Sequence, residues 1–281
     1  MPRKYLLNKI CKNEECKKPF KTKHLHQETC SRRCGITLLR KREIEQNKNY
    51  QVWSCGGGVD SVGVAVLIYQ GELPKPDYAI MTDNGYEASY TWDYVNQTLK
   101  PKMLEVGVNL HIIKSSDYVN MNIVVNNRVV LPAYSSQNGK VVRFNTQCSG
   151  PWKLIPVKRW LREQGVKRCV NWVGISADEG RRVKDSRLKW ITYKYPLAER
   201  NLSRRDCKRL ITKAGWPVPL RSSCIICPQK TDNQWLDLRD DYPDDWDRAV
   251  EIERDIHKTH PYIFLHRSLL PLQYAKFKGG G

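Results

Sequence analysis

The sequence predicts an α/β fold built on an open parallel sheet, preceded by a small cysteine-rich module. Three observations predict it. Strand-like and helix-like runs alternate from residue 50 onward, three glycines follow the first of these strands, and four cysteines form two pairs near the amino end. Such alternation is typical of parallel strands joined by crossover helices. A chain of 281 residues can hold one such core and a small appendage.

The hydrophobic pattern gives the expected order of elements. We expect strands at 50–54, 78–82, 108–113 and 170–175, and helices at 60–69, 87–100, 156–164, 203–214, 233–239 and 243–258. Two β-rich runs within 124–144, around 135–139, predict a hairpin inserted into the sheet topology. The final third is expected to be helical and irregular. The expected domains are a zinc-binding module at 1–35, a basic linker or helix at 36–49, the main domain at 50–270 and a tail at 271–281.

Composition excludes several classes of protein. Hydrophobic residues make up 40% and charged residues 27% of the chain, which argues against general disorder. No run of 18 apolar residues is present, and the amino end lacks the apolar stretch of a signal peptide. We therefore expect a soluble cytoplasmic protein with no membrane partner.

The charge balance predicts a polyanionic partner. The formal net charge is +19, from 48 Lys and Arg against 29 Asp and Glu, and residues 1–49 hold 14 of these cations with only 5 acids. DNA or RNA is the first candidate for such a partner. A solvated basic surface is the alternative.

The first four cysteines, Cys11, Cys16, Cys30 and Cys34, have the spacing of a structural zinc site. Thiolates hold Zn²⁺ tetrahedrally, and such a site can fold a segment too short to bury its own core. The expected layout is a knuckle, a short hairpin and a second knuckle, with the last cysteine opening a helix. Four unrelated buried cysteines are the alternative.

A glycine loop follows the first expected strand, in the order Cys55, Gly56, Gly57, Gly58, Val59, Asp60, Ser61. Glycines let backbone N–H groups approach an anion closely, and the following helix directs its positive end at the same place. Ser61 can donate to a phosphate, and Asp60 can position Mg²⁺ or cap the helix. The loop is neither a Walker A loop nor a dinucleotide fingerprint. A tight turn without a ligand is the alternative.

Polar residues also follow two other expected strands. Asp83, Asn84 and Gly85 come after the second strand, and Asp178 and Glu179 come after a later one, followed by Arg181 and Arg182. Ligands bind at such strand ends in open α/β sheets, so we expect residues 83–85 to meet the glycine loop over one nucleotide. The carboxylates, Asp178 above all, are candidate Mg²⁺ ligands, and the arginines, Arg181 above all, could neutralise charge that grows in a transition state. Ordinary helix-start electrostatics is the alternative.

A second set of cysteines, Cys148, Cys207, Cys224 and Cys227, lies in the main domain. Residues 224–228 form a Cys-x-x-Cys-Pro turn, which presents two sulfurs to one metal or cluster. The four could complete the coordination of a 4Fe–4S cluster or form a second zinc site. Cys169 is expected in the core, and Cys55 is more often a packing residue than a nucleophile at such a place.

Several of these segments resemble a known family. Residues 55–61 are similar to the Ser-Gly-Gly-x-Asp-Ser signature of PP-loop ATP pyrophosphatases, with Gly56 in place of the first serine. Residues 82–87, 148–156, 174–179, 195–197 and 222–228 resemble motifs of PP-loop proteins like phosphoadenosine phosphosulfate (PAPS) reductase, which are common in phages and bacteria. The resemblance covers roughly residues 50–270.

This resemblance implies the adenine nucleotide alpha-hydrolase fold and cleavage of ATP between its α and β phosphates, in a bacterial or phage-infected host cell. By analogy with the sulfur-transfer ATPase of DNA phosphorothioation, it implies that the second cysteine set holds an iron–sulfur cluster. The expected reaction is Mg²⁺-dependent adenylation of an acceptor, with nucleic acid favoured, followed by sulfur transfer. The sequence does not identify the sulfur donor or reductant.

Two other functions stay open at this stage. A reductase acting on PAPS or adenylyl sulfate needs a nucleophilic cysteine in its carboxyl-terminal tail, and residues 269–281 contain none. Cys55 or Cys227 would have to replace it. The other reading is a non-catalytic protein that senses a nucleotide and binds nucleic acid.

Overall fold

The computed structural model describes residues 7–126 and 128–278, without the side chains of residues 42–47. The chain forms two compact units, which are described separately. One comprises residues 1–49 with 167–169, and the other comprises residues 50–166 and 170–281.

The first unit is built from one hairpin and one helix. Strands β1 (Leu7–Ile10) and β2 (Pro19–Thr22) pair antiparallel, and α1 spans Arg32–Asn47. The first cysteine pair lies in the loop of this hairpin, so the expectation that a hairpin separates the two pairs is wrong. Cys34 lies in the first turn of α1, as expected for a cysteine that opens a helix.

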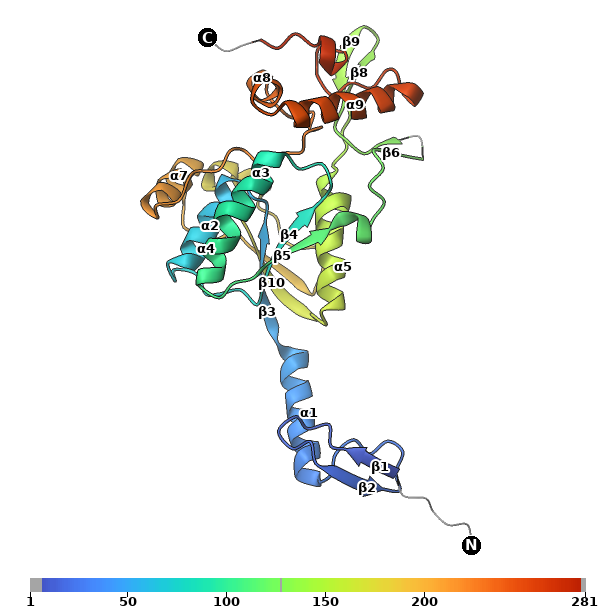
Figure 1. Cartoon of the computed structure of the whole chain (residues 1–281), viewed down its shortest axis with the longest axis vertical. Helices are drawn as coiled ribbons and strands as arrows, with labels where there is room; N and C mark the ends of the chain where they lie inside the picture. Colours follow the sequence, from blue (N-terminus) through green and yellow to red (C-terminus); the bar gives the residue numbers. More distant parts are fainter. Residues whose placement is uncertain (1–6, 127, 279–281) are drawn as a thin grey trace. The chain divides into compact units, whose positions relative to one another are not determined.

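The second unit contains a central five-stranded sheet with the order β11-β10-β3-β4-β5 (Figure 1). The strands are β3 (Asn49–Cys55), β4 (Tyr78–Asp83), β5 (Leu110–Lys114), β10 (Arg168–Val173) and β11 (Ile191–Lys194). Strand β4 runs parallel to both of its neighbours, β3 and β5. The α/β class is confirmed. Strand β11 was not expected, because an edge strand of four residues carries too short a pattern to be recognised.

Helices cover the sheet on both sides (Figure 1). Helices α2 (Val59–Tyr69), α3 (Ser89–Tyr94) and α4 (Lys100–Glu105) lie on one side, and α5 (Ile155–Glu163) lies on the other. Ten consecutive residues of α2 are buried because α7 (Arg204–Lys213) packs on it from outside. The predicted helix 87–100 is α3 continued through a π-helical turn (Val95–Leu99) into α4. A similar turn (Gly150–Leu154) precedes α5.

A second core lies among the carboxyl-terminal helices α8 (Asp232–Asp241) and α9 (Pro243–Thr259). It also includes residues from around two hairpins, β6 (Val124–Val125) with β7 (Arg128–Val129) and β8 (Tyr134–Gln137) with β9 (Lys140–Arg143). Only one hairpin was expected. Short helical segments are α6 (Pro196–Glu199) and 3-10 turns at Ser115–Asp117, Ala177–Arg182 and Leu272–Tyr274. None of the described helices is long and apolar enough to cross a membrane.

Candidate active site

The glycine loop connects β3 to the buried helix α2, as the sequence predicts. Gly57 has φ +71°, and a Cβ there would lie 2.8 Å from the Cγ2 atom of Thr91. Only glycine therefore fits the turn. The backbone N–H of Gly56 donates to Ser61 Oγ at 2.9 Å, so the hydroxyl of Ser61 also holds the loop in shape.

Strand β10 leads into a segment that lies tightly against the start of α2. A Cβ on Gly174 would come within 2.8 Å of the backbone nitrogen of Ser61 and 2.9 Å of the carbonyl carbon of Asp60. A side chain at this position would displace the first turn of the helix. The two segments, far apart in the sequence, thus build one rigid wall.

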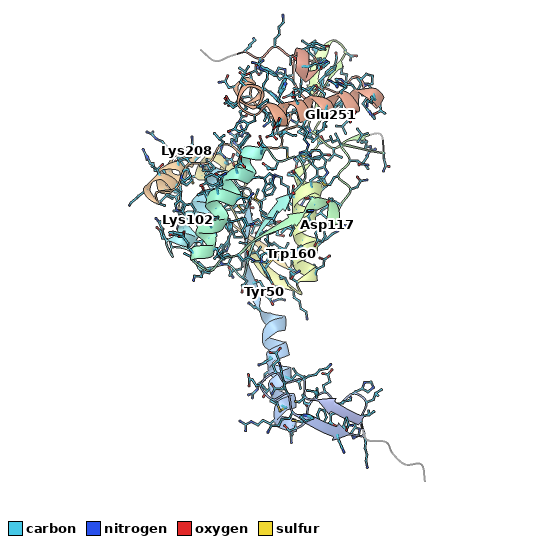
Figure 2. All side chains as sticks on the ribbon, viewed as in Figure 1. Tyr50, Lys102, Asp117, Trp160, Lys208 and Glu251 are labelled. Carbon is cyan, nitrogen blue, oxygen red and sulfur yellow. The ribbon has the colours of Figure 1, made fainter. Side chains whose placement is uncertain are left out.

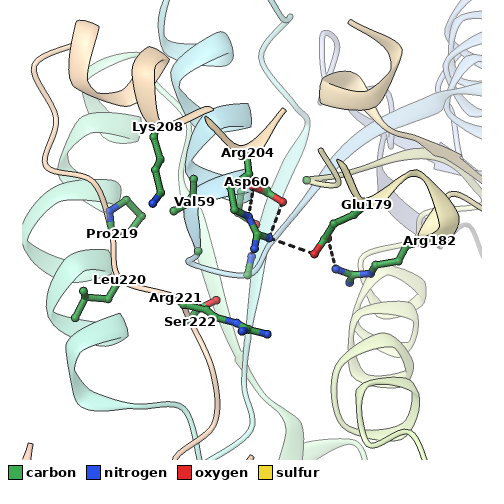
Figure 3. A pocket seen from close by; sticks show the side chains of 14 residues that line it. Val59, Asp60, Glu179, Arg182, Arg204, Lys208, Pro219, Leu220, Arg221 and Ser222 are labelled. Carbon is green, nitrogen blue, oxygen red and sulfur yellow. Dashed lines mark hydrogen bonds and ion pairs between the residues drawn. The ribbon is translucent and has the colours of Figure 1, made fainter. Parts of the chain in front are cut away.

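A cavity of 540 Å³ opens over the loop (Figure 3). Four cationic side chains and two carboxylates line it; these are Arg182, Arg204, Lys208 and Arg221, with Asp60 and Glu179. The charge excess and the amino end of α2 together suit a polyphosphate.

Arg204 organises the acidic side of this cavity. Its Nε and Nη2 atoms donate to the two carboxylate oxygens of Asp60 at 3.1 and 3.0 Å, and Nη2 also lies 3.3 Å from Glu179 Oε1 (Figure 3). The hydrogen bonds to buried Asp60 raise the pKa of Arg204 above its usual value. The guanidinium therefore stays charged and holds both carboxylates at the cavity wall.

Two predicted catalytic residues lie outside this cavity. Asp178 Oδ2 accepts the backbone N–H of Arg204 at 2.7 Å, so it ties the start of α7 in place. Arg181 lines a neighbouring cavity, whereas the adjacent Arg182 lines both. Among the residues expected from this segment, the described structure thus places Glu179 and Arg182 at the loop rather than Asp178 and Arg181.

Residues 83–85 do not join the glycine loop around one cavity. Asp83 Oδ1 accepts the N–H of Gly85 at 2.8 Å, which closes a turn. All three residues line a separate cavity of 320 Å³, with Lys114 and Arg248. Asn84 also lines the cavity of the three cysteines. The expectation that residues 83–85 and the glycine loop meet over one nucleotide stays a prediction.

Cys148, Cys224 and Cys227 line one cavity of 720 Å³. Asn84, which is buried, donates from Nδ2 to Cys224 Sγ at 3.1 Å. Burial raises the pKa of Cys224 to about 12, so its thiolate form needs a metal or a cation beside it. These three cysteines are the part of the predicted set that the structure brings together.

Cys207, the fourth cysteine of the predicted set, does not line this cavity. It is fully buried on α7, and its Sγ atom lies 3.1 Å from the position that a Cβ on Gly63 of α2 would take. Its hydrophobic neighbours belong to the core beside the sheet, whereas Cys148 and Cys224 pack on the carboxyl-terminal core. The prediction that Cys207 joins the other three is corrected here: its place on α7 makes it a packing residue.

An ion pair with a buried carboxylate and a partly exposed amine lies beside these three sulfurs. Lys153 Nζ lies 3.0 Å from Glu87 Oε2, and the side chain of Glu87 is only 1% exposed. Although burial disfavours the charged amine, Glu87 and the nearby thiols keep the pKa of Lys153 above its usual value. The other oxygen of Glu87 is buried with no hydrogen-bond partner.

A second lysine lines the same cavity. Lys230, whose pKa is lowered by burial, donates to Ser223 Oγ on the cavity wall.

The spacing of these sulfurs bears on which centre they fit. Around one tetrahedral zinc ion, ligand sulfurs stand about 3.8 Å apart, given Zn–S bonds of about 2.3 Å. The sulfurs of Cys148, Cys224 and Cys227 do not all lie within 4.8 Å of one another. In an iron–sulfur cluster each thiolate binds a different iron, so wider spacing is required. Three thiols that line one cavity are ligands that either kind of centre uses.

Cys55 and Cys169 are core residues. Burial raises the pKa of Cys55 to about 12, and its Sγ accepts the N–H of Gly57 at 3.4 Å. A thiol of this kind is a poor nucleophile at neutral pH. Cys169 is 1% exposed on β10, as predicted.

The two cavities share a wall. Glu179, Arg182, Arg221 and Ser222 line both the cavity over the glycine loop and the cavity that holds the three cysteines. The same four residues therefore face a group bound over the loop on one side and the cavity of the three cysteines on the other.

Sequence reasoning missed several of these residues. Arg204 and Lys208 are one helical turn apart and face the same cavity. The capping box of Ser203 and Asp206 fixes the start of α7, and it could have been recognised from the sequence. Nothing in the sequence, however, indicates that this helix end faces the loop. Arg221 and Glu87 likewise reach the site only through tertiary contacts.

In the amino-terminal unit the four predicted cysteines come together. Atoms Sγ of Cys11, Cys16, Cys30 and Cys34 all lie within 4.8 Å of one another, and Cys16 and Cys30 are 3.5 Å apart. The donor set and spacing fit one tetrahedral metal ion.

The chain is similar to solved structures but matches no known family by sequence. No protein-family model and no curated protein matches the sequence. Among solved structures, the chain is similar to PAPS reductase from Candida auris in a phosphate complex, with 14% identity and a TM-score of 0.39 over 65% of this chain and 80% of that one. It is also similar to the U34-tRNA thiolase NcsA from Methanococcus maripaludis with its 4Fe–4S cluster, with 18% identity and a TM-score of 0.41 over 90% and 82%.

The first of these neighbours bears the name of the family that the sequence motifs resemble. Identities this low and TM-scores below 0.5 leave the assignment of activity to the geometry of this chain's own site.

Proposed function

We propose that this protein is a PP-loop enzyme that uses ATP to adenylate an oxygen of an acceptor with release of pyrophosphate, after which a sulfur nucleophile displaces AMP from the activated position. The observation that carries the proposal is the wall shared by the glycine-loop cavity and the three-cysteine cavity. Activation and sulfur delivery need adjacent sites, because an adenylated intermediate would otherwise meet water first.

The chain's own residues have distinct roles in this proposal. The N–H groups of the loop and the amino end of α2 bind the phosphates. Arg204, Lys208 and Arg221 offset their negative charge, which grows as pyrophosphate leaves. Asp60, whose two carboxylate oxygens accept hydrogen bonds from Arg204, would be the ligand of Mg²⁺.

Cys148, Cys224 and Cys227 would hold an iron–sulfur cluster in the second cavity. Bound by these three cysteines, such a cluster would supply a site for exogenous sulfide, the sulfur to be transferred. Lys153 and Asn84 lie beside these sulfurs, where an amine and an amide N–H stabilise thiolate charge. In the amino-terminal unit the proposed metal is zinc, with a structural role.

Nucleic acid is the proposed acceptor, and the basic composition supports it. A reductase is less well supported, since Cys55 is buried with a raised pKa and is unsuited to attack sulfate sulfur. No feature of the described residues favours it over the adenylation reaction.

The test combines metal analysis with product detection on protein purified without oxygen. The full chain should contain iron and sulfide, and it should form AMP and pyrophosphate from ATP with single-stranded or structured DNA or RNA. Asp60→Ala should lose ATP binding and turnover, whereas Asp255→Ala, an exposed carboxylate on α9, should keep both. If neither DNA nor RNA elicits AMP, the non-catalytic reading takes the place of this proposal.

Two cysteine variants test the ligand set. Cys227→Ser should lower the iron content, whereas Cys207→Ala should retain it, because Cys207 packs between α2 and α7. If both variants lose iron to the same extent, Cys207 is a ligand too, and the assignment of three cysteine ligands is wrong.

A further inference from the structure

An exposed basic loop follows the Ala177–Arg182 turn and ends at β11. Residues 181–189 contain five cations and one acid; the cations are Arg181, Arg182, Lys184, Arg187 and Lys189. All five cationic residues are exposed. We call this segment the basic loop.

Hydrogen bonds and one stacking contact hold the backbone of the basic loop in place. Tyr195, which is buried, donates from Oη to the carbonyl of Lys184 at 2.7 Å and accepts its N–H at 3.2 Å. Ser186 Oγ accepts the N–H of Leu188 at 3.1 Å. At the end of the loop, the ring of Trp190 stacks with the guanidinium of Arg162 at 3.8 Å. The cations therefore project from an ordered backbone, which lowers the entropic cost of binding a ligand.

The basic loop also forms part of the cysteine cavity. Arg181, Arg182 and Lys184 line that cavity, and Arg182 reaches the glycine-loop cavity as well. Arg187 and Lys189 line neither of these two cavities. Three of the five cations thus line the cavity of the cysteines, and the other two lie outside it in the same loop.

We propose that the basic loop binds the phosphodiester backbone of a single-stranded nucleic acid and presents one nucleotide to the cysteine cavity. This inference rests on the proposed function and names its acceptor more narrowly. Phosphates of one strand would follow the row of cations, which supplies sequence-independent affinity.

The shape of the surface favours a single strand over other polyanions. A cavity of 720 Å³ can take one nucleotide only after its base has left the stack, which costs least in a strand that is already unpaired. A membrane surface would not reach Arg181, Arg182 and Lys184, because these three line a cavity.

The test measures binding of a fluorescent single-stranded oligonucleotide to the full chain by anisotropy, over a series of salt concentrations. The variant is Arg187→Gln with Lys189→Gln. The control, Lys75→Gln with Lys213→Gln, removes the same charge from exposed sites outside both cavities. Losing two phosphate contacts should make the fall of log affinity with log salt less steep by about 1.4. It should also weaken the affinity at 0.1 M salt by about 10- to 30-fold.

Several results would overturn the basic loop as the binding surface. One is an oligonucleotide affinity in the loop variant that equals that of the control. Another is an equal loss of ATP affinity, measured on the same preparations, since the cations would then serve the nucleotide. Tighter binding of a duplex, or displacement of the oligonucleotide by polyglutamate of equal charge, would refute the choice of a single strand. Failure of the wild-type chain to form AMP concerns the proposed function alone and leaves these binding results intact.

Discussion

At the scale of single residues, the site depends on charged groups whose partners come from distant parts of the chain. Glu87 follows β4 and is 1% exposed, yet its neutralising partner Lys153 precedes α5. A buried carboxylate without such a partner is costly, because desolvation is no longer offset. The pair therefore fixes the wall of the cysteine cavity as well as its charge.

Lys153→Met should destabilise the protein by about 2 kcal/mol, a value reduced from that of a fully buried pair because Lys153 is 37% exposed. Urea denaturation measures the change. Glu87→Gln combined with Lys153→Met should recover much of the loss, since no charge is then left unpaired. The exposed control Lys100→Met should have little effect. Equal stability of Lys153→Met and this control would show that the pair contributes nothing.

At the scale of elements, the glycine loop is presented by a helix that is buried on nearly all sides. Helix α2 lies between the sheet and α7, and the contact with α7 runs through Gly63. Its amino end can point a fixed set of N–H groups at a ligand because the helix cannot shift.

Gly63→Ala should destabilise the protein by about 1–3 kcal/mol, because the new Cβ would lie 3.1 Å from Cys207 Sγ in a packed core. Replacing glycine by alanine within a helix normally stabilises a protein by about 1 kcal/mol. A loss of stability in Gly63→Ala would therefore indicate the close contact with Cys207. Thermal or urea unfolding gives the comparison. Gly180→Ala, where no atom lies within 4 Å of the new Cβ, is the control and should be close to neutral. A stabilised Gly63→Ala variant would contradict the packing of α7 on α2.

At the scale of the whole molecule, the two units differ in how they are stabilised. The larger unit buries two hydrophobic cores. Among the described residues of the amino-terminal unit outside 167–169, the only buried hydrophobic side chain is that of Cys11. Such a unit cannot offset its conformational entropy by burial alone. A metal held by its four cysteines would supply the missing free energy.

Removal of metal with a strong chelator should therefore unfold β1, β2 and α1 while the central sheet persists. Hydrogen exchange read by mass spectrometry would show rapid exchange in residues 7–41 and unchanged protection of β3, β4 and β5. Cys16→Ser should show the same pattern without chelator. Protection of the amino-terminal unit that survives chelation would mean that no metal is needed there.

Local patterns in the sequence determined much of this protein. The periodicity and composition of hydrophobic residues predicted the bounds of β3, α2, β4 and α7 to within a residue or two. The spacing of four cysteines predicted the group formed by Cys11, Cys16, Cys30 and Cys34. Each of these signals is carried by residues close together in the chain. The glycine loop belongs to the same class of signal, because its turn requires glycine at Gly57 wherever the rest of the chain lies.

Only the tertiary structure decided which distant residues share a cavity. It separated Cys207 from the other three cysteines, and it decided that Glu179 rather than its neighbour Asp178 lines the cavity over the loop. It also brought Arg204 and Arg221 to the phosphate side. It also joined the two cavities through four shared residues. The physical reason is that helix packing and loop direction set these contacts, and both depend on the shapes of surfaces that form only when the whole core assembles.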